Sequence, residues 1–225
     1  MIRNVIFDFG AVLFQWKPLQ IVQTFTQSVD EQNILMREVL AHPDWLELDR
    51  GTMLIAEEIP KFAARTNISV QRMEDFFSHI QLSLEKIPET EALFFKLLDQ
   101  NYPLYYLTNM CSAFFETLYE KHHFISFFDG GVVSGKELTM KPEPEIFHLL
   151  CERYGLEPHE CLFIDDHYPN IETAKALGFN TVLFTPTQTC LDEIEEILTM
   201  FSEKNNLLDN FLHSFEPNIM KSVYY

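Results

Sequence analysis

Positive charge is scarce in this sequence. Its 225 residues include 16 Lys and Arg against 34 Asp and Glu, which gives a formal charge of −18 at pH 7. A surface this acidic repels nucleic acid and anionic membranes, so neither is expected as a partner. It also repels phosphorylated small molecules, so a site for such an anion needs a local cation or a metal ion. Elsewhere on the surface the charge serves solubility.

Paired cysteines and long apolar segments are also missing. The four cysteines, Cys111, Cys151, Cys161 and Cys190, form no CxxC pair and no regular framework, which is typical of a reducing compartment. No uninterrupted apolar stretch reaches the length of a membrane span, and the N-terminal apolar run is too short and too acidic for a signal peptide. We therefore expect a cytoplasmic protein without a membrane partner.

Material for a packed core is plentiful. Hydrophobic residues make up 47% of the chain and include 21 Phe, a composition unlike that of disordered proteins. The length suits one sizeable domain, or a core domain that carries a smaller inserted one.

Short apolar runs alternate with helical patterns over much of the chain. The expected strands are residues 5–9 (VIFDF), 104–108, 131–134, 161–165 and 181–184. The expected helices between and after them are residues 89–100, 111–121, 144–154 and 171–177. This alternation predicts an α/β fold, a Rossmann-like parallel sheet with helices on both faces.

Two segments fall outside the alternation. Residues 16–88 contain few β-branched runs and many apolar residues at helical spacing, such as Ile55, Ile59 and Phe62, which predicts an inserted helical cap. The predicted domains are therefore an α/β core of residues 1–15 and 89–200, a cap of residues 16–88 and a C-terminal helical tail of residues 201–225.

The tail carries an apolar stripe at helical spacing, formed by Leu207, Leu208, Phe211, Leu212 and Phe215. Such a stripe suits packing against the same chain or a contact in a homodimer. Monomer and homodimer both stay open.

Polar side chains lie at the expected ends of the core strands. Asp8 ends the first strand, Thr108 and Asn109 end the second, Lys141 precedes a helix, and Asp165 and Asp166 end the fourth. Each residue alone could be a turn former or a solvated loop residue. In open parallel sheets, however, ligands bind beyond the carboxyl ends of the strands, so their common location indicates one site.

These residue types suit phosphoryl transfer. A carboxylate such as Asp8 can attack phosphorus to give an aspartyl phosphate, which splits hydrolysis into two easier steps. Carboxylates held close together repel one another and require a cation, and oxygen ligands alone favour Mg²⁺. Lys141 supplies a fixed positive charge for the phosphoryl oxygens, and Thr108 can donate its hydroxyl to them.

The runs FDFGAVLF, LTNM, MKPEPEIF and FIDDHYPNIETAKALG resemble the four ordered motifs of haloacid dehalogenase (HAD) superfamily hydrolases. The resemblance covers about residues 2–185, and the insertion sits where that superfamily carries its helical cap. The sequence is most similar to the bacterial branch that contains α-D-glucose-1-phosphate phosphatase, whose first motif also has Gly two residues after the nucleophile. The cap segment DRGTMLIAEEI resembles the Arg-Gly turn and acidic helix of caps in that branch.

The resemblance implies a role for each motif residue. The implied Mg²⁺ ligands are Asp8, the carbonyl of Gly10, Asp166 and, directly or through water, Asp165. The implied catalytic and phosphate-binding residues are Asp8 as the nucleophile, Thr108 and Lys141, with Asn109 near the leaving group. In the cap, Arg50 is expected either to contact the substrate or to cap its helix through a salt bridge. The implied activity is Mg²⁺-dependent hydrolysis of a small phosphorylated substrate, with a small sugar phosphate as its class.

Gly10 departs from the pattern of the superfamily. Most of its phosphatases carry a second Asp at this position, which protonates the leaving oxygen and then activates water. Gly10 has no acid or base, and general acid–base catalysis is worth roughly 10²–10⁴-fold. His167, beside the acidic pair, is either a substitute or a loop histidine that orders the turn.

Two other functions stay open. The loss of the second Asp allows a weak or inactive HAD-fold protein that binds or regulates. A 2-haloacid dehalogenase is the other candidate, but that chemistry needs no metal, and the dehalogenase branch lacks the acidic pair formed here by Asp165 and Asp166.

Overall fold

The structure, a computed structural model, describes residues 1–200. The predicted C-terminal tail, with its stripe at Leu207, Leu208, Phe211, Leu212 and Phe215, lies outside the described residues. Within residues 1–200, no helix combines the length and the apolar character needed to cross a bilayer.

A parallel sheet of five strands forms the centre of the core. Its strands are β1 (Asn4–Phe7), β2 (Leu104–Thr108), β3 (Gly130–Val133), β4 (Cys161–Asp165) and β5 (Asn180–Leu183). They lie in the order β3-β2-β1-β4-β5, and all neighbours pair in parallel. The predicted α/β fold with a parallel sheet is confirmed.

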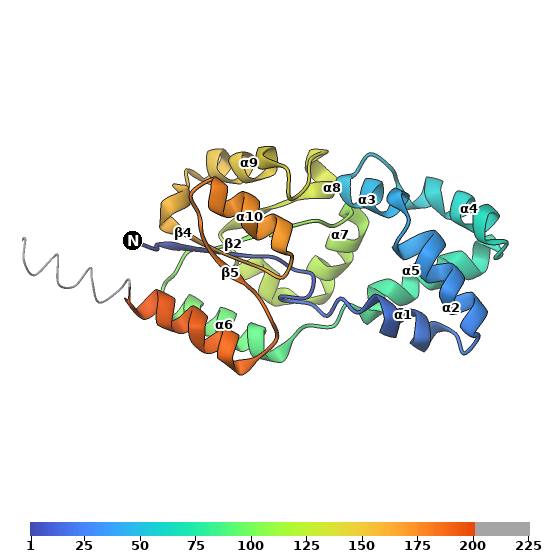
Figure 1. The fold of residues 1–225 in the computed structure, drawn as a ribbon, viewed down its shortest axis with the longest axis horizontal. Coiled ribbons are helices and arrows are strands. Elements are labelled where there is room, and N and C mark those ends of the chain that lie inside the picture. Colours follow the sequence, from blue (N-terminus) through green and yellow to red (C-terminus); the bar gives the residue numbers. More distant parts are fainter. Residues whose placement is uncertain (201–225) are drawn as a thin grey trace, which may run out of the picture.

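Helices cover both faces of this sheet (Figure 1). Helices α9 (Pro144–Tyr154) and α10 (Tyr168–Ala176) cover one face, and α6 (Pro88–Asp99), α7 (Ser112–Lys121) and the helical residues 188–200 cover the other. Successive residues of β1 point to opposite faces, so Val5 and Phe7 belong to one buried cluster and Ile6 to another. Burial on both faces explains why the strands are continuously apolar.

Short elements complete the core. They are the 3₁₀ turns His123–Phe127 and Pro158–Glu160 and the helix α8 (Ser134–Glu137), which directly follows β3. The first strand is shorter than predicted at its carboxyl end, because it ends at Phe7. Asp8 and Phe9, predicted to lie in that strand, therefore lie in the loop that leaves the sheet.

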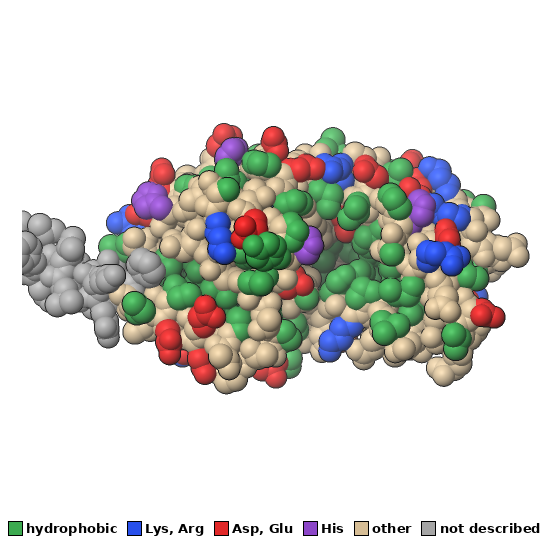
Figure 2. Space-filling view, in the orientation of Figure 1, with side chains coloured by type: hydrophobic (Ala, Val, Ile, Leu, Met, Phe, Trp, Pro, Cys, Tyr) green, Lys and Arg blue, Asp and Glu red, His purple; other side chains and the backbone are tan. Residues whose placement is uncertain are grey.

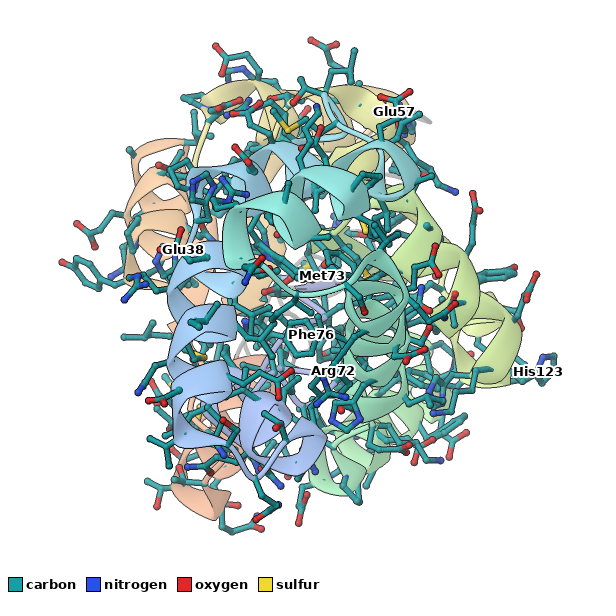
Figure 3. All side chains as sticks on the ribbon, turned by 90° about the vertical axis from the view of Figure 1, so that its right-hand side faces the viewer. Glu38, Glu57, Arg72, Met73, Phe76 and His123 are labelled. Carbon is teal, nitrogen blue, oxygen red and sulfur yellow. The ribbon has the colours of Figure 1, made fainter. Side chains whose placement is uncertain are left out.

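A second group of helices lies beside one end of the core (Figure 1). It consists of α1 (Pro18–Phe25), α2 (Val29–Leu35), a π-helical turn (Met36–Leu40), α3 (Pro43–Arg50), α4 (Ile55–Thr66) and α5 (Val70–Ser83). Ser28 and Ser69 cap α2 and α5 by accepting hydrogen bonds from backbone N–H groups of the first turn. Met73 and Phe76 lie at the centre of this group, with Glu38 and Glu57 at its rim (Figure 3).

Two linkers join this helical group to the core, and they contact each other. The backbone of the first linker pairs with that of the second through Gln15 N–H to Glu85 O, 2.7 Å, and Ile87 N–H to Leu13 O, 2.8 Å. We propose these paired linkers as the boundary between the core and a cap, close to the limits expected from the sequence.

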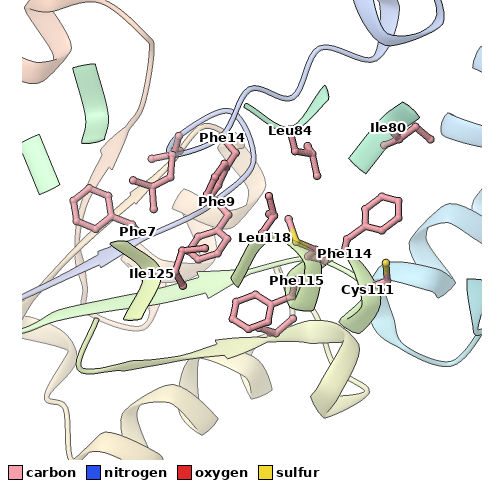
Figure 4. Close-up of a cluster of buried hydrophobic side chains, with 14 of the residues drawn as sticks. Phe7, Phe9, Phe14, Ile80, Leu84, Cys111, Phe114, Phe115, Leu118 and Ile125 are labelled. Atoms are coloured by element: carbon pink, nitrogen blue, oxygen red, sulfur yellow. The ribbon is translucent and has the colours of Figure 1, made fainter. Parts of the chain in front are cut away.

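The hydrophobic interior continues across this boundary. Ile80 of α5 and Leu84, directly after it, lie in the same buried cluster as Phe114 of α7 and Phe9 of the core (Figure 4). Shared apolar burial of this kind holds the helical group against the core edge where the strands end.

Candidate active site

The carboxyl ends of the three central strands meet at one edge of the sheet. Asp8 directly follows β1, Thr108 ends β2 and Asp165 ends β4, and β2 and β4 flank β1. The chain runs from β1 to β2 and β3 on one side and later to β4 and β5 on the other. The strand order therefore reverses at β1, where open α/β sheets form their ligand sites.

A buried lysine joins two of these carboxylates. The Lys141 ammonium lies 2.9 Å from Asp8 Oδ1 and 2.6 Å from Asp165 Oδ2, and the lysine side chain is 1% exposed. Burial by itself lowers the pKa of Lys141, but the carboxylates of Asp165 and Asp8 outweigh burial and raise it. The ammonium therefore stays charged beside the predicted nucleophile.

Asp165 is held by several other donors. Its carboxylate accepts hydrogen bonds from the His167 backbone N–H at 2.8 Å and from the Asn170 amide at 3.0 and 3.1 Å. With the Lys141 ammonium added, both of its oxygens have partners on the protein. This arrangement suits the water-mediated alternative for Asp165 better than direct coordination of a metal ion.

Three carboxylates form a candidate metal site. Asp8, Asp165 and Asp166 each offer an oxygen atom, and these atoms all lie within 4.8 Å of one another. Burial raises the pKa of Asp8, opposed by Lys141, and burial followed by the charge of Asp165 raises the pKa of Asp166. Three carboxylates facing one ammonium leave an excess of negative charge. An oxygen donor set with uncompensated charge fits a hard dication such as Mg²⁺.

Thr108 and Asn109, at the end of β2, have different roles in the site. The Thr108 side chain is fully buried, and its hydroxyl makes no hydrogen bond within residues 1–200. An unpartnered buried hydroxyl at a strand end is available for a phosphate oxygen. The Asn109 amide instead exchanges two 2.8 Å hydrogen bonds with the Lys141 backbone. Asn109 thus positions Lys141, although it also lines the pocket.

A pocket of about 240 Å³ opens above these residues, between the core and the cap. Its floor includes Asp8, Gly10 and Lys141 of the core. Its rim is apolar, with Trp16, Trp45 and Leu84 from the cap and its linkers and Met110 and Phe114 from the core. Trp16 and Trp45 stack with ring centroids 5.6 Å apart. Hydrophobic side chains gather around a hollow between the two parts of the molecule (Figure 2).

Asp49 lines this pocket, whereas its neighbour Arg50 does not. Arg50 makes two hydrogen bonds to Glu143, of 2.8 and 2.6 Å, and is absent from the pocket lining. This ion pair fits the salt-bridge alternative for Arg50, but it joins the end of α3 to the core residue before α9. Contact between Arg50 and the substrate stays a prediction. Asp49 lines the same pocket as Asp8, a position that the sequence analysis does not predict. The acidic residue before the Arg-Gly turn was its one signal.

Gly10 and His167 also line the pocket. A Cβ on Gly10 would meet only the Trp16 Cβ, at 3.9 Å, and the Gly10 backbone lies outside the left-handed region. His167 is the exposed residue before α10, and its backbone N–H holds Asp165. This contact uses only the backbone of His167, so both roles expected for its side chain stay open.

Comparisons with known proteins show the family and the fold. A family model described as haloacid dehalogenase-like hydrolase matches residues 2–178. The chain is 26% identical over 191 residues to the sesquiterpene phosphatase astK of Aspergillus oryzae, which covers 84% of this chain and 94% of the relative. It is 27% identical over 190 residues to D-ribitol-5-phosphate phosphatase of Bacteroides thetaiotaomicron, which covers 80% of this chain and 91% of the relative.

A solved structure shows the same fold. It is that of a HAD family enzyme from Bacteroides thetaiotaomicron in complex with magnesium and inorganic phosphate. Its TM-score is 0.70 and its sequence identity 22%, and the match covers 84% of this chain and 96% of that chain.

Proposed function

This chain belongs to the haloacid dehalogenase-like hydrolases, and from that premise we propose that it is a Mg²⁺-dependent phosphatase that hydrolyses phosphate monoesters through an aspartyl phosphate on Asp8. One observation carries the proposal: the Lys141 ammonium and the carboxylates of Asp8, Asp165 and Asp166 converge at the carboxyl ends of adjacent strands. Two relatives named as phosphatases match over more than nine tenths of their own length, and they support it.

Each residue of the site has a part in two displacements at phosphorus. An Asp8 oxygen attacks the phosphorus atom, the bond from phosphorus to the ester oxygen breaks, and the alcohol departs with a proton. Water then attacks the same phosphorus, the bond to Asp8 breaks, and inorganic phosphate leaves. Lys141 and the Thr108 hydroxyl bind the phosphoryl oxygens as charge builds on them. Asp8, Asp166 and the carbonyl of Gly10 would hold Mg²⁺, which would supply further positive charge at the phosphoryl group.

Removal of metal tests the proposal directly. We expect hydrolysis to stop when excess EDTA is present and to return when Mg²⁺ is added beyond the chelator, because the carboxylates lose the dication that offsets their repulsion. Release of inorganic phosphate from a panel of monoesters is the measurement. Full turnover in excess chelator would refute the metal assignment. Halide release from a 2-haloacid in the presence of EDTA, with no phosphate release from any ester, would favour metal-free dehalogenase chemistry. No turnover of any ester would favour the binding or regulatory alternative.

The proposal also includes a substrate class, for which there are two candidates. The resemblance to sugar phosphate phosphatases favours a small sugar phosphate, and a relative that is a D-ribitol-5-phosphate phosphatase supports it. The rim of Trp16, Trp45, Leu84 and Phe114 favours a second candidate, the phosphate ester of an apolar alcohol, and a sesquiterpene phosphatase is also a relative. The two differ in hydrophobicity, so kcat/KM for paired sugar and terpenyl phosphates distinguishes them.

The proposal includes a cytoplasmic location. The four cysteines are all free thiols, which supports a reducing compartment.

A further inference from the structure

The chemistry of the proposed function leaves one task without a residue. An alcohol that leaves phosphorus needs a proton, and the water of the second step must lose one. The position that carries this acid and base in most phosphatases of the superfamily holds Gly10, which has no side chain. Another titratable group that faces the same pocket can exchange these protons.

The pocket offers few titratable side chains for this task. Asp8, Asp166 and Lys141 already serve as nucleophile, metal ligand and phosphate ligand. Among the other residues that line it, Asp49 and His167 carry titratable groups. His167 follows Asp166 on the core. Asp49 belongs to α3 of the cap, the element that faces the core across the pocket.

The direction of attack favours the cap residue. In an in-line displacement, the leaving oxygen lies on the side of phosphorus opposite the nucleophile. The nucleophile Asp8 is part of the core floor, so the leaving oxygen faces the cap. We propose that Asp49 is a catalytic residue of this phosphatase, a general acid that gives its carboxyl proton to the leaving oxygen and a general base that takes a proton from the attacking water. This inference rests on the proposed function and names the residue that completes it.

Three contacts hold the end of α3 against the core. The Ser134 hydroxyl, next to β3, donates a hydrogen bond to the backbone carbonyl of Asp49. Gly51 follows the helix at φ 88°, and a Cβ there would lie 2.3 Å from the Gly135 carbonyl oxygen, so glycine alone permits this approach. The Arg50–Glu143 ion pair adds a third contact. Asp49 is thus held firmly, as proton transfer requires.

The surroundings of the Asp49 carboxyl favour its protonated form. Burial raises its pKa to about 8, opposed by the backbone of Cys111 and the side chain of Trp45, while the charge of Asp8 adds a smaller rise. The other titratable groups in this pocket are Lys141, Asp166 and His167. Since burial is the largest cause, the carboxyl holds its proton at neutral pH, ready for the first step.

The proton balance then closes without another reactant. In the first step the phosphorus–oxygen bond of the ester breaks, and the Asp49 proton moves to the departing oxygen, which leaves as the alcohol. In the second step water forms the new bond to phosphorus and gives a proton to the Asp49 carboxylate. The carboxyl is restored when inorganic phosphate leaves.

The dependence on the leaving group tests this role. Nitrophenolate can leave without being protonated, whereas an alkoxide needs a proton as it leaves. In Asp49→Asn we expect a nitrophenolate burst at the wild-type rate followed by slow turnover, because only the second step needs the base. With an alkyl phosphate we expect no burst and a phosphorylation rate lower by roughly 10²–10⁴-fold. Rapid-quench measurements on the full chain with Mg²⁺ give both rates.

Two further variants make the test specific. Glu47→Gln removes an acid from the same helix but outside the pocket lining, and it should match the wild type. Gly10→Asp has room for its Cβ and restores a carboxylate at the family position. In the Asp49→Asn background it should raise alkyl phosphate turnover at least tenfold.

Other results would overturn the assignment. An equal loss of phosphorylation rate with nitrophenyl and alkyl phosphates would show that Asp49 is structural. Alkyl phosphate turnover at the wild-type rate in Asp49→Asn would show that another group transfers the proton. If the proposed function itself is wrong, the result differs from both of these, because the wild type would then release no phosphate from either ester.

Discussion

Asp8→Asn is expected to leave a folded protein whose turnover is lower by about 10⁶-fold, the size of loss seen when a catalytic nucleophile is removed. An amide oxygen is a poor nucleophile, so no aspartyl phosphate forms. The amide also binds a dication more weakly than a carboxylate does. Phosphate release and mass spectrometry of acid-quenched enzyme measure the two consequences, the lost turnover and the missing phosphoryl group.

A matched variant controls for the change of charge. Asp99→Asn alters an exposed carboxylate at the end of α6, and it should keep wild-type turnover. Both the Asp8→Asn protein and the wild type should melt in one transition, a result that would show that the fold survives. More than a few per cent of residual activity, with no reversion of Asn to Asp detected by mass, would contradict covalent catalysis at Asp8.

Lys141→Met is expected to lower turnover by about 10²–10³-fold, the range for loss of one electrostatic contact to a transition state. Methionine replaces the buried stem but removes the ammonium that lies 2.9 Å from Asp8 and 2.6 Å from Asp165. Two buried carboxylates are then left without their cation, which costs about 3–5 kcal/mol of unfolding free energy. Steady-state kinetics in the presence of Mg²⁺ measures the loss of turnover, and denaturant unfolding in the absence of Mg²⁺ measures the loss of stability.

The exposed Lys136 provides the control for this variant. Lys136→Met breaks a surface ion pair of 3.7 Å with Glu116 and a cation–π contact with the Phe115 ring, 5.0 Å to its centroid. Turnover should not change, and the unfolding free energy should fall by less than about 2 kcal/mol. Added Mg²⁺ should restore part of the stability of Lys141→Met, because a bound cation replaces some of the lost charge. A Lys141→Met enzyme with wild-type kcat would exclude Lys141 from transition-state stabilisation.

Local patterns predicted most of the core. The runs at 104–108 and 161–165 form β2 and β4 with those bounds, and the helix at 144–154 is α9. These segments are strongly apolar or begin with Pro and end before Gly, so their local preferences agree with the fold. The first strand ends two residues earlier than predicted, since apolar Phe9 turns into the core from the loop rather than from the sheet.

The motif residues also follow from the sequence, because parallel strands place all their carboxyl ends at one edge. Alternation of strands and helices therefore sufficed to bring Asp8, Thr108 and Asp165 together. The sequence could not show that Asn109 holds the Lys141 backbone, or that Asp165 accepts from Asn170. Those hydrogen bonds depend on loop conformations that no periodic pattern describes.

The sequence by itself thus determined the class of fold, the edge of the sheet that carries the chemistry and the residue types at that edge. The tertiary structure decided which cap residue faces the site. Asp49 and Arg50 are neighbours on α3, and successive helical residues point about 100° apart. The docking of α3 on α8, through Gly51 and Gly135, directs Asp49 to the pocket and Arg50 to Glu143. Such a choice depends on how two helices meet, and no local pattern encodes it.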